Sequence, residues 1–192
     1  MKKRPRRIVI LKAAGRLFFH YGPLKTTIAD IAKEAQVGVG SVYLEFRSKD
    51  EILSALSEQL YGAVLQAERD AWAVPGTVPA RLARVFERRL DAFLEKAQAG
   101  AHGPDLFGRS CGAVAEAHER FAEEERTLLA SFLEEAGVHE PVRSEAAVAL
   151  LDAHAAFSPP SLFKSAPDTL RGRLRAMHRV LLTNLRFAAP TD

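Results

Sequence analysis

Residues 26–46 constrain the fold of this chain more than any other part of its sequence. Apolar side chains recur there at helical spacing, before and after a short break at residues 36–38; they are Ile28, Ile31, Ala32, Ala35, Val42 and Phe46. Thr27 precedes the first run and Asp30 follows three residues later, so a hydroxyl can cap the helix start and a carboxylate can favour its positive end. The pattern predicts two short helices joined by a tight turn, a helix-turn-helix.

The second helix of this motif has two unlike sides. A helix of this length is not stable alone in water, so we expect Val42 and Phe46 to pack it against the first helix. Its other side carries Val39, Gly40, Tyr43 and Leu44. We predict that this side faces outward and contacts a partner.

Residues 10–53 resemble the DNA-binding domain of the TetR family of transcriptional repressors. The matching positions keep the family's spacing without a gap: Leu17, Phe18, Gly22, Thr26, Thr27, Ile31, Ala32, Ala35, Val37, Gly40, Tyr43, Phe46, Lys49 and Leu53. The rest of the chain offers no motif of its own. The resemblance implies a helix-turn-helix DNA-binding domain at residues 1–48 and a helical effector-binding and dimerisation domain at residues 49–192.

Helical periodicity continues beyond the motif, and no segment has the pattern of a strand. We predict an all-α fold of about nine helices, which besides the two in the motif cover residues 5–21, 48–72, 80–98, 105–117, 118–136, 141–157 and 168–189. No apolar run approaches the roughly 20 residues that a membrane span requires. The basic N-terminus also lacks the form of a secretory signal, so we expect a cytoplasmic protein with no membrane contact.

Charge is distributed unevenly along the chain. Through Lys49 there are 11 Lys and Arg residues against 3 acidic residues, a net charge of +8. Because the whole chain is +3, residues 50–192 carry −5. We call residues 1–49 the head and residues 50–192 the body. A basic head on an acidic body is typical of a protein that contacts nucleic acid with one end, although the alternative is that these charges are only solvated.

The resemblance implies phosphate contacts for Thr27, Tyr43 and Lys49. Their alternative roles are a helix cap for Thr27, a packed ring for Tyr43 and a solvated charge for Lys49. We expect Lys3, Arg4 and Arg6 of the basic arm to bind phosphates or a narrow minor groove. The predicted base-facing surface is formed by Gly38, Val39, Gly40, Ser41 and Leu44.

Three positions of this surface depart from the family pattern. Gly38, Val39 and Leu44 stand where polar or basic residues are common in the family, so few hydrogen bonds to bases are expected and thymine methyl contacts are the remaining direct readout. We therefore predict modest sequence discrimination and a steep salt dependence. Gln36 replaces the glycine that is usual in the turn, which predicts a strained left-handed residue if the turn is conserved in shape.

The resemblance also implies a small-molecule effector site in the body. Candidates to line it are Trp72, Phe86, Phe93, Phe107, Cys111, His118, Phe121 and His154. Aromatic residues at helical spacing can equally form plain core. Cys111, the single cysteine, is expected to be a small buried apolar residue, with a redox role as the alternative. No metal-ligand spacing or cofactor motif is present, and the effector is not identifiable from the sequence.

Dimerisation is implied through the last two helices. Ala146 and Leu150 in one, and Leu174, Met177, Leu181 and Leu185 in the other, form apolar arcs wider than a single core-facing stripe. Burial within one subunit is the alternative. A homodimer would present two heads to a near-palindromic site in double-stranded DNA.

The sequence therefore predicts a dimeric, ligand-released repressor. The first alternative is a nucleoid-type protein that coats DNA with little sequence preference, and the second is a small helical enzyme. No set of nucleophile, base and orienting residue, and no phosphate-binding loop, supports an enzyme.

Overall fold

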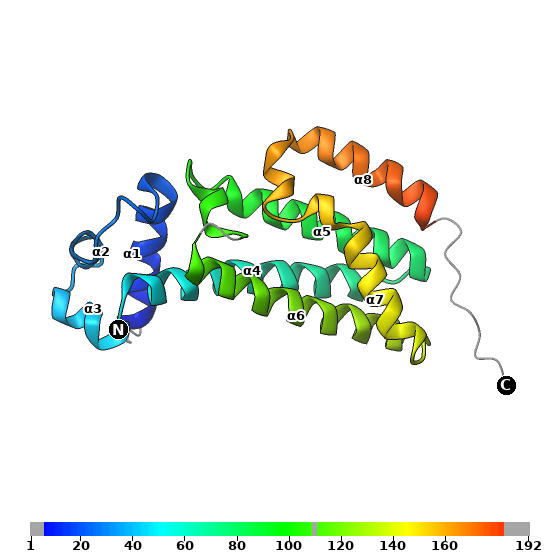
Figure 1. Ribbon diagram of the computed structural model, residues 1–192, viewed down its shortest axis with the longest axis horizontal. Coiled ribbons are helices and arrows are strands. Elements are labelled where there is room, and N and C mark those ends of the chain that lie inside the picture. Colours follow the sequence, from blue (N-terminus) through cyan, green and yellow to red (C-terminus); the bar gives the residue numbers. More distant parts are fainter. Residues whose placement is uncertain (1–5, 109–110, 183–192) are drawn as a thin grey trace. The chain divides into compact units, whose positions relative to one another are not determined.

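The structure, a computed structural model, describes residues 6–108 and 111–182. Within these ranges the chain is helical, without strands, as predicted (Figure 1). Eight α-helices are present: α1 (Arg6–Tyr21), α2 (Ile28–Glu34), α3 (Val39–Glu45), α4 (Lys49–Ala73), α5 (Val78–Ala97), α6 (Gly112–Glu135), α7 (Val142–Ala153) and α8 (Pro167–Leu181). Lys3, Arg4 and Leu185 lie outside the described residues, so their predicted contacts stay predictions.

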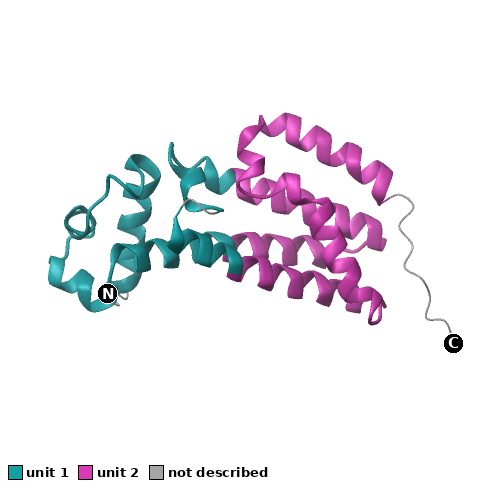
Figure 2. Cartoon of the chain, in the orientation of Figure 1, with its two compact units in different colours: residues 1–61, 95–119 teal, residues 62–94, 120–192 magenta. Residues whose placement is uncertain are grey.

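The described chain forms two compact units (Figure 2). Unit 1 comprises residues 1–61 and 95–119, and unit 2 comprises residues 62–94 and 120–192. Helices α4, α5 and α6 contribute residues to both units. Unit 1, which contains the helix-turn-helix, therefore extends past residue 48, where the sequence predicts the domain boundary. Whether residues 1–48 fold independently stays a prediction.

Unit 1 is built around the apolar face of α1. Its core includes Ile10, Phe18, Ile31, Val42, Phe46 and Ile52, each 1% exposed or less. Helix α1 ends where predicted, because Gly22 has a φ of +83°, a conformation that glycine adopts without a Cβ penalty, and Pro23 follows it. Helix α4 is capped as predicted by Ser48, whose Oγ accepts a hydrogen bond from the Glu51 amide at 3.1 Å.

Helix α6 corrects the sequence prediction of two elements that meet between residues 117 and 118. Residues 103–106 form a short 3-10 helix, η1 (Gly103–Leu106), and α6 then runs unbroken from Gly112 to Glu135. Its buried positions keep helical spacing across the predicted break, at Val114, Ala117, Phe121, Glu125, Leu128 and Phe132. No glycine or proline lies between residues 113 and 135, so nothing in the backbone interrupts the helix.

Unit 2 packs the remaining parts of α4, α5 and α6 with the C-terminal helices. Leu82, Phe93 and Leu133 are among its fully buried residues. Helix α7 ends at Ala153, four residues earlier than predicted, and is followed by the 3-10 helices η2 (Ala155–Phe157) and η3 (Ser161–Lys164), the latter in a segment predicted to be a loop. No helix among the described residues is long and apolar enough to cross a membrane.

Candidate nucleic-acid interface

Helix α2 is fixed at its start by a capping box. The Thr27 hydroxyl oxygen accepts from the Asp30 amide at 3.2 Å, and the Asp30 carboxylate accepts from the Thr27 amide at 2.9 Å. The Asp30 carboxylate also accepts from the Thr27 hydroxyl, and this hydrogen bond, followed by the one from the Thr27 amide, lowers the pKa of Asp30 below its ordinary value. The cap predicted from the sequence is therefore confirmed.

The turn after α2 is a Schellman motif with glutamine at its left-handed position. The Gln36 amide donates to the Lys33 carbonyl at 3.1 Å and the Val37 amide donates to the Ala32 carbonyl at 3.0 Å. Gln36 has a φ of +55°, which is the strained backbone that the sequence predicted. This turn sets the direction in which α3 leaves α2.

Helix α3 has the two unlike sides expected. Val42 and Phe46 are buried, whereas Val39, Tyr43 and Leu44 are 43%, 54% and 79% exposed. Gly38 and Gly40 are also exposed, and a Cβ at either position would meet no atom within 4 Å. The outward side of α3 is consequently a low, mostly apolar surface with Ser41 half-buried at its edge.

Two predicted phosphate contacts already have partners within the chain. The Thr27 hydroxyl donates to Asp30 Oδ2 at 2.6 Å. Lys49 Nζ donates to the Pro23 carbonyl at 2.8 Å and to the Thr26 carbonyl at 3.1 Å. Lys49 thus fastens the start of α4 to the loop before α2, and one of its three N–H donors remains for a phosphate.

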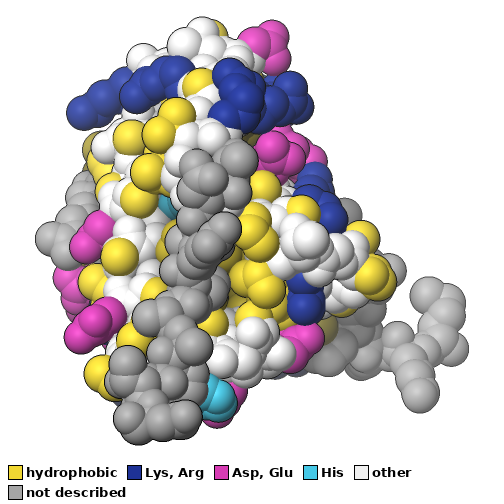
Figure 3. All heavy atoms as spheres, turned by 90° about the vertical axis from the view of Figure 1, so that its right-hand side faces the viewer, with side chains coloured by type: hydrophobic (Ala, Val, Ile, Leu, Met, Phe, Trp, Pro, Cys, Tyr) yellow, Lys and Arg dark blue, Asp and Glu magenta, His cyan; other side chains and the backbone are white. Residues whose placement is uncertain are grey.

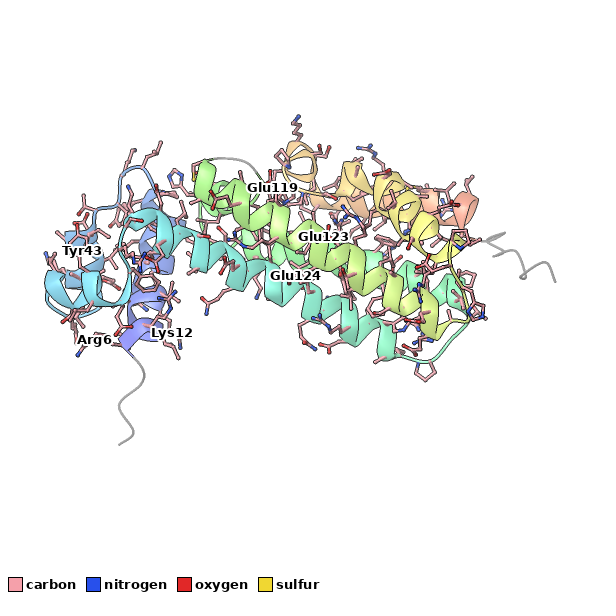
Figure 4. The ribbon with its side chains drawn as sticks, turned by 60° about the horizontal axis from the view of Figure 1, so that its bottom comes forward. Arg6, Lys12, Tyr43, Glu119, Glu123 and Glu124 are labelled. Carbon is pink, nitrogen blue, oxygen red and sulfur yellow. The ribbon has the colours of Figure 1, made fainter. Side chains whose placement is uncertain are left out.

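Arg7 is a residue whose role the sequence did not reveal. Its guanidinium donates to the Glu45 carbonyl at 2.7 Å and lies 4.0 Å from the centre of the Phe46 ring. Arg7 therefore holds the end of α3 against α1. The sequence showed it only as one charge in a basic arm, because its partners are 38 and more residues away. Arg6 is also exposed, and Figure 4 shows it on the head with Lys12 and Tyr43.

The predicted effector-site residues are distributed over both units. Phe107, Cys111 and His118 belong to unit 1, where Tyr61 makes an edge contact with Phe107 and a 3.1 Å hydrogen bond with His118 Nδ1. Cys111 is exposed, so the prediction of a buried cysteine is wrong. It lies in the connection just before α6 and not on a packed helix face.

In unit 2 the other candidates form separate aromatic pairs. Phe86 stacks on His154 with ring centres 3.5 Å apart, and Phe93 meets Phe121 edge-on at 5.7 Å. Trp72 stacks on Phe132 at 4.8 Å, and its Nε1–H donates to Glu135 Oε2 at 2.7 Å. Each of these rings has a packing partner, as expected if these residues only form the hydrophobic core, the alternative that the sequence left open. Their role around an effector stays a prediction.

A buried ionic cluster in unit 2 was missed by sequence reasoning. The guanidinium of Arg89, on α5, forms a forked ion pair with Glu125 of α6, lies 3.4 Å from Glu68 Oε1 of α4, and donates to Ser158 Oγ at 2.9 Å. Burial, followed by the nearby charge of Glu125, raises the pKa of Glu68 well above its ordinary value. The available signal was that Arg89 lies within the apolar stripe of α5, between Phe86 and Phe93.

A buried pair of histidines joins the end of α7 to α8. His154 Nδ1 lies 2.6 Å from the Leu150 carbonyl, and His154 Nε2 lies 3.0 Å from His178 Nε2. Since a carbonyl can only accept, the Nδ1 of neutral His154 carries the proton and its Nε2 accepts from the Nε2–H of His178. His178 Nδ1 is then buried without a partner among the described residues. Burial lowers the pKa of both side chains, that of His154 to about 3.

Comparison with known proteins identifies the type of helix-turn-helix domain in this chain. Residues 10–56 match the family model described as bacterial regulatory proteins, tetR family. Residues 10–56 form a TetR-family DNA-binding domain. The match covers the whole helix-turn-helix and the first turns of α4, so it includes every described residue of the candidate interface except Arg6 and Arg7.

Curated relatives are similar to this chain mainly over the head. The HTH-type transcriptional regulator TtgR of Pseudomonas putida is 42% identical over 55 residues, 29% of this chain and 26% of the relative. The fatty acid metabolism regulator protein of Bacillus subtilis is 29% identical over 87 residues, 45% of each chain. The chain therefore spans less than half the length of either relative.

Solved structures are similar to the chain over nearly its full length. The fatty acid degradation regulator FadR from Bacillus halodurans has a TM-score of 0.66 at 20% identity, covering 98% of this chain and 100% of that one. A putative TetR-family regulator from Syntrophomonas wolfei has a TM-score of 0.69 at 19% identity, covering 96% and 98%. At such low identity these similarities establish the fold of the chain and nothing finer.

The described residues that were predicted to form the dimer surface differ in exposure. Leu174 is 1% exposed and packs within its own subunit, so its prediction as a partner contact is wrong. Ala146, Leu150 and Met177 are half-buried. Leu181 is 46% exposed, next to Val180 at 73%. Figure 3 shows one face of the molecule, on which hydrophobic side chains lie at the surface among charged ones. Among the described residues, no cluster of three or more His, Cys, Asp or Glu could hold a metal ion.

Proposed function

We propose that the chain is a sequence-specific DNA-binding transcriptional regulator, a cytoplasmic homodimeric repressor that a small molecule releases from DNA. The observation that carries this proposal is the orientation of α3. Val42 and Phe46 are buried and anchor the helix, while the side chains of Val39, Tyr43 and Leu44 are exposed. A protruding helix of this kind fits the major groove, where base edges are distinguishable.

Affinity and specificity would arise from different residues. Exposed basic side chains of the head, including Arg6, Lys25, Lys33 and Arg47, supply phosphate neutralisation. The α3 surface supplies Leu44 and Val39 for contact with thymine methyl groups, Ser41 for one hydrogen bond, and the Tyr43 hydroxyl for a phosphate. Direct readout is consequently limited to few bases.

Selection of bound sequences from random double-stranded DNA tests the proposal. We expect a near-palindrome, and we expect Leu44→Ala to change the preferred bases at one position of each half-site. Lys33→Ala, which removes an exposed charge of α2, should weaken binding equally on selected and random DNA and should lower the salt slope by about 1. Repeating the selection with a metabolite extract should reveal release by an effector.

A nucleoid-type role is the second candidate, because the outward side of α3 carries no Arg, Asn or Gln among residues 38–45. The same selection separates the two functions. Recovery of no consensus, together with equal affinity for all duplexes, would favour DNA coating. Turnover of a substrate by a chain that lacks residues 1–49 would instead favour an enzyme.

The homodimer is proposed to form through α7 and α8, by way of Leu150, Met177, Leu181 and, if it continues the helix face, Leu185. Exposed Val148, Val180 and Leu181 support this assignment, since large apolar side chains on neighbouring helices commonly mark an interface. The effector is proposed to bind in the body among the aromatic residues of unit 2.

A further inference from the structure

A surface hollow in unit 1 is not explained by DNA binding. It has a volume of about 560 Å³ and lies between α1, the first part of α4 and the loop at residues 99–100. Sites that hold small molecules usually measure about 300–1,000 Å³. All of its lining residues belong to unit 1, and none is on the outward side of α3.

The floor of the hollow is apolar and its rim is basic. Leu11 and Leu56 lie at the floor, both less than a tenth exposed, together with Gly15. Lys12, Arg16 and His20 follow one another at intervals of one helical turn along α1. No aspartate or glutamate lines the hollow. Arg16 pairs with Glu34 at 2.7 Å, whereas Lys12 is exposed and has no ion pair within the described residues.

Gly15 is unusual because the packing of the chain does not require a glycine there. A Cβ at this position would lie 3.5 Å from the nearest methyl of Leu56, which is ordinary van der Waals contact. A glycine inside a helix costs about 0.5–1 kcal/mol relative to alanine. What the missing side chain does provide is open space over Leu56, in the floor of the hollow.

The opposite wall is firmly fixed to α1. A Cβ at Gly100 would lie 2.4 Å from the Phe19 carbonyl oxygen, so the loop approaches the α1 backbone as closely as only glycine allows. The His102 amide also donates to the Phe19 carbonyl at 3.0 Å. The hollow is therefore a formed site with a rigid edge.

We propose that this hollow binds a single-chain anionic amphiphile, with its carboxylate at Lys12 and Arg16 and its hydrocarbon chain over Leu11, Gly15 and Leu56. A carboxylate gains charge-assisted hydrogen bonds from the two cations. The hydrocarbon chain gains by leaving water for an apolar floor. The basic rim without a carboxylate excludes a cationic ligand of the same shape. This site is separate from the effector site proposed in unit 2.

Calorimetric titration of the full chain with dodecanoate, below its micelle concentration and without DNA, tests the proposal. We expect saturable binding of dodecanoate, and no binding of dodecyltrimethylammonium or acetate at the same concentrations. Lys12→Glu should weaken dodecanoate binding about tenfold, the equivalent of roughly 1.4 kcal/mol. Lys25→Glu, the matched charge change outside the hollow, should leave it unchanged.

Gly15→Leu and Gly15→Ala form a second matched pair. Leucine fills the floor and should abolish binding, whereas alanine leaves most of the space and should bind within about threefold of the original chain. Amide resonances of residues 15 and 100 should shift on titration. Equal binding by the original chain, Lys12→Glu and Gly15→Leu, or shifts confined to unit 2, would overturn the proposal. Capture of phosphatidylglycerol vesicles without binding of monomeric dodecanoate would also overturn it in favour of a membrane surface.

Discussion

Gln36 is a single residue that strains the backbone of an otherwise favourable turn. Its φ of +55° is the one left-handed backbone at a non-glycine residue in the described ranges. Gly137, with a φ of +84°, occupies the equivalent position after α6, where its amide donates to the Glu134 carbonyl and that of Val138 donates to the Leu133 carbonyl. The two turns have the same hydrogen bonds and differ in the residue at the left-handed position.

Gln36→Gly should raise the free energy of unfolding by about 1 kcal/mol. Removing the Cβ relieves a left-handed strain of roughly 1–2 kcal/mol, and the greater freedom of glycine in the unfolded chain returns part of that gain. Thermal melts of the two proteins measure the difference. Gly137→Gln, the reverse change in the matching turn, should be destabilising. A neutral or destabilising Gln36→Gly would show that the turn is not strained.

Protonation of the His154–His178 pair should destabilise the fold in acid. Both folded pKa values lie below the ordinary 6.5, so the unfolded chain binds more protons as the pH falls through 6.5. Stability is therefore full above pH 6.5, and the part due to His154 is lost towards pH 3 at up to about 1.4 kcal/mol per pH unit. His178 contributes in the same direction. Glu68, whose folded pKa is raised, contributes with the opposite sign.

Denaturant unfolding at pH 7, 6 and 5 measures this dependence. His154→Gln should reduce the slope, and because Glu68 is present in both proteins the difference isolates the histidine pair. His139→Gln, a change at an exposed histidine, should leave the slope unaltered. Identical slopes for the original chain and His154→Gln would contradict the assignment.

At the scale of elements, two basic residues of the head stabilise the packing of its helices by hydrogen bonds, a role that their charge alone did not indicate. Lys49 at the start of α4 bonds to two carbonyls before α2, and Arg7 of α1 bonds to the last carbonyl of α3. Each basic residue satisfies carbonyl groups that a helix end or a loop leaves unpaired.

Lys49→Met should therefore lower stability as well as DNA affinity. Loss of two charge-assisted hydrogen bonds to carbonyls in a half-buried place should cost about 1–2 kcal/mol. A denaturant titration followed by circular dichroism measures it. Lys33→Met, at an exposed position on α2, is the control and should change stability by less than about 0.5 kcal/mol. If both variants unfold like the original chain, Lys49 acts on DNA alone.

Local signals decided which elements the sequence could predict. The capped start of α2, the inward Val42 and Phe46, and the Gly22-Pro23 stop depend on residues a few positions apart, and all were confirmed. The break predicted in α6, between residues 117 and 118, is wrong. The glycines of residues 99–112 suggested a separate short helix ending at residue 117, but they all lie at or before the start of α6. Arg89 and Leu174 could not be placed from sequence, since their burial depends on partners from distant helices.

At the scale of the whole molecule, the candidate functions lie in different parts of the chain. The outward side of α3 and the α1–α4 hollow belong to unit 1, whereas the ionic cluster around Arg89 and the exposed end of α8 belong to unit 2. Helix α6 presents Glu119, Glu123 and Glu124 to solvent (Figure 4). Repulsion of DNA phosphates by this acidic helix would help restrict DNA contact to the basic head.

Leu181→Glu should convert the proposed dimer into a monomer. A carboxylate placed opposite its own copy in a two-fold interface is both desolvated and repelled. Sedimentation at a fixed protein concentration measures the change. Val74→Glu is the matched control, because Val74 is also exposed, at 49% against 46% for Leu181, but lies in the loop before α5. Dimers of both variants would place the interface elsewhere.

The surroundings of Trp72 make the protein its own optical probe. It is the only tryptophan in the chain, sandwiched between the Phe132 ring and the Arg81 guanidinium, which lies 3.6 Å from its ring centre. Its emission therefore reports on unit 2 alone and is blind to melting of the head. Comparing the emission transition with the far-ultraviolet dichroism transition would reveal, without any label, whether the two units melt as one cooperative block.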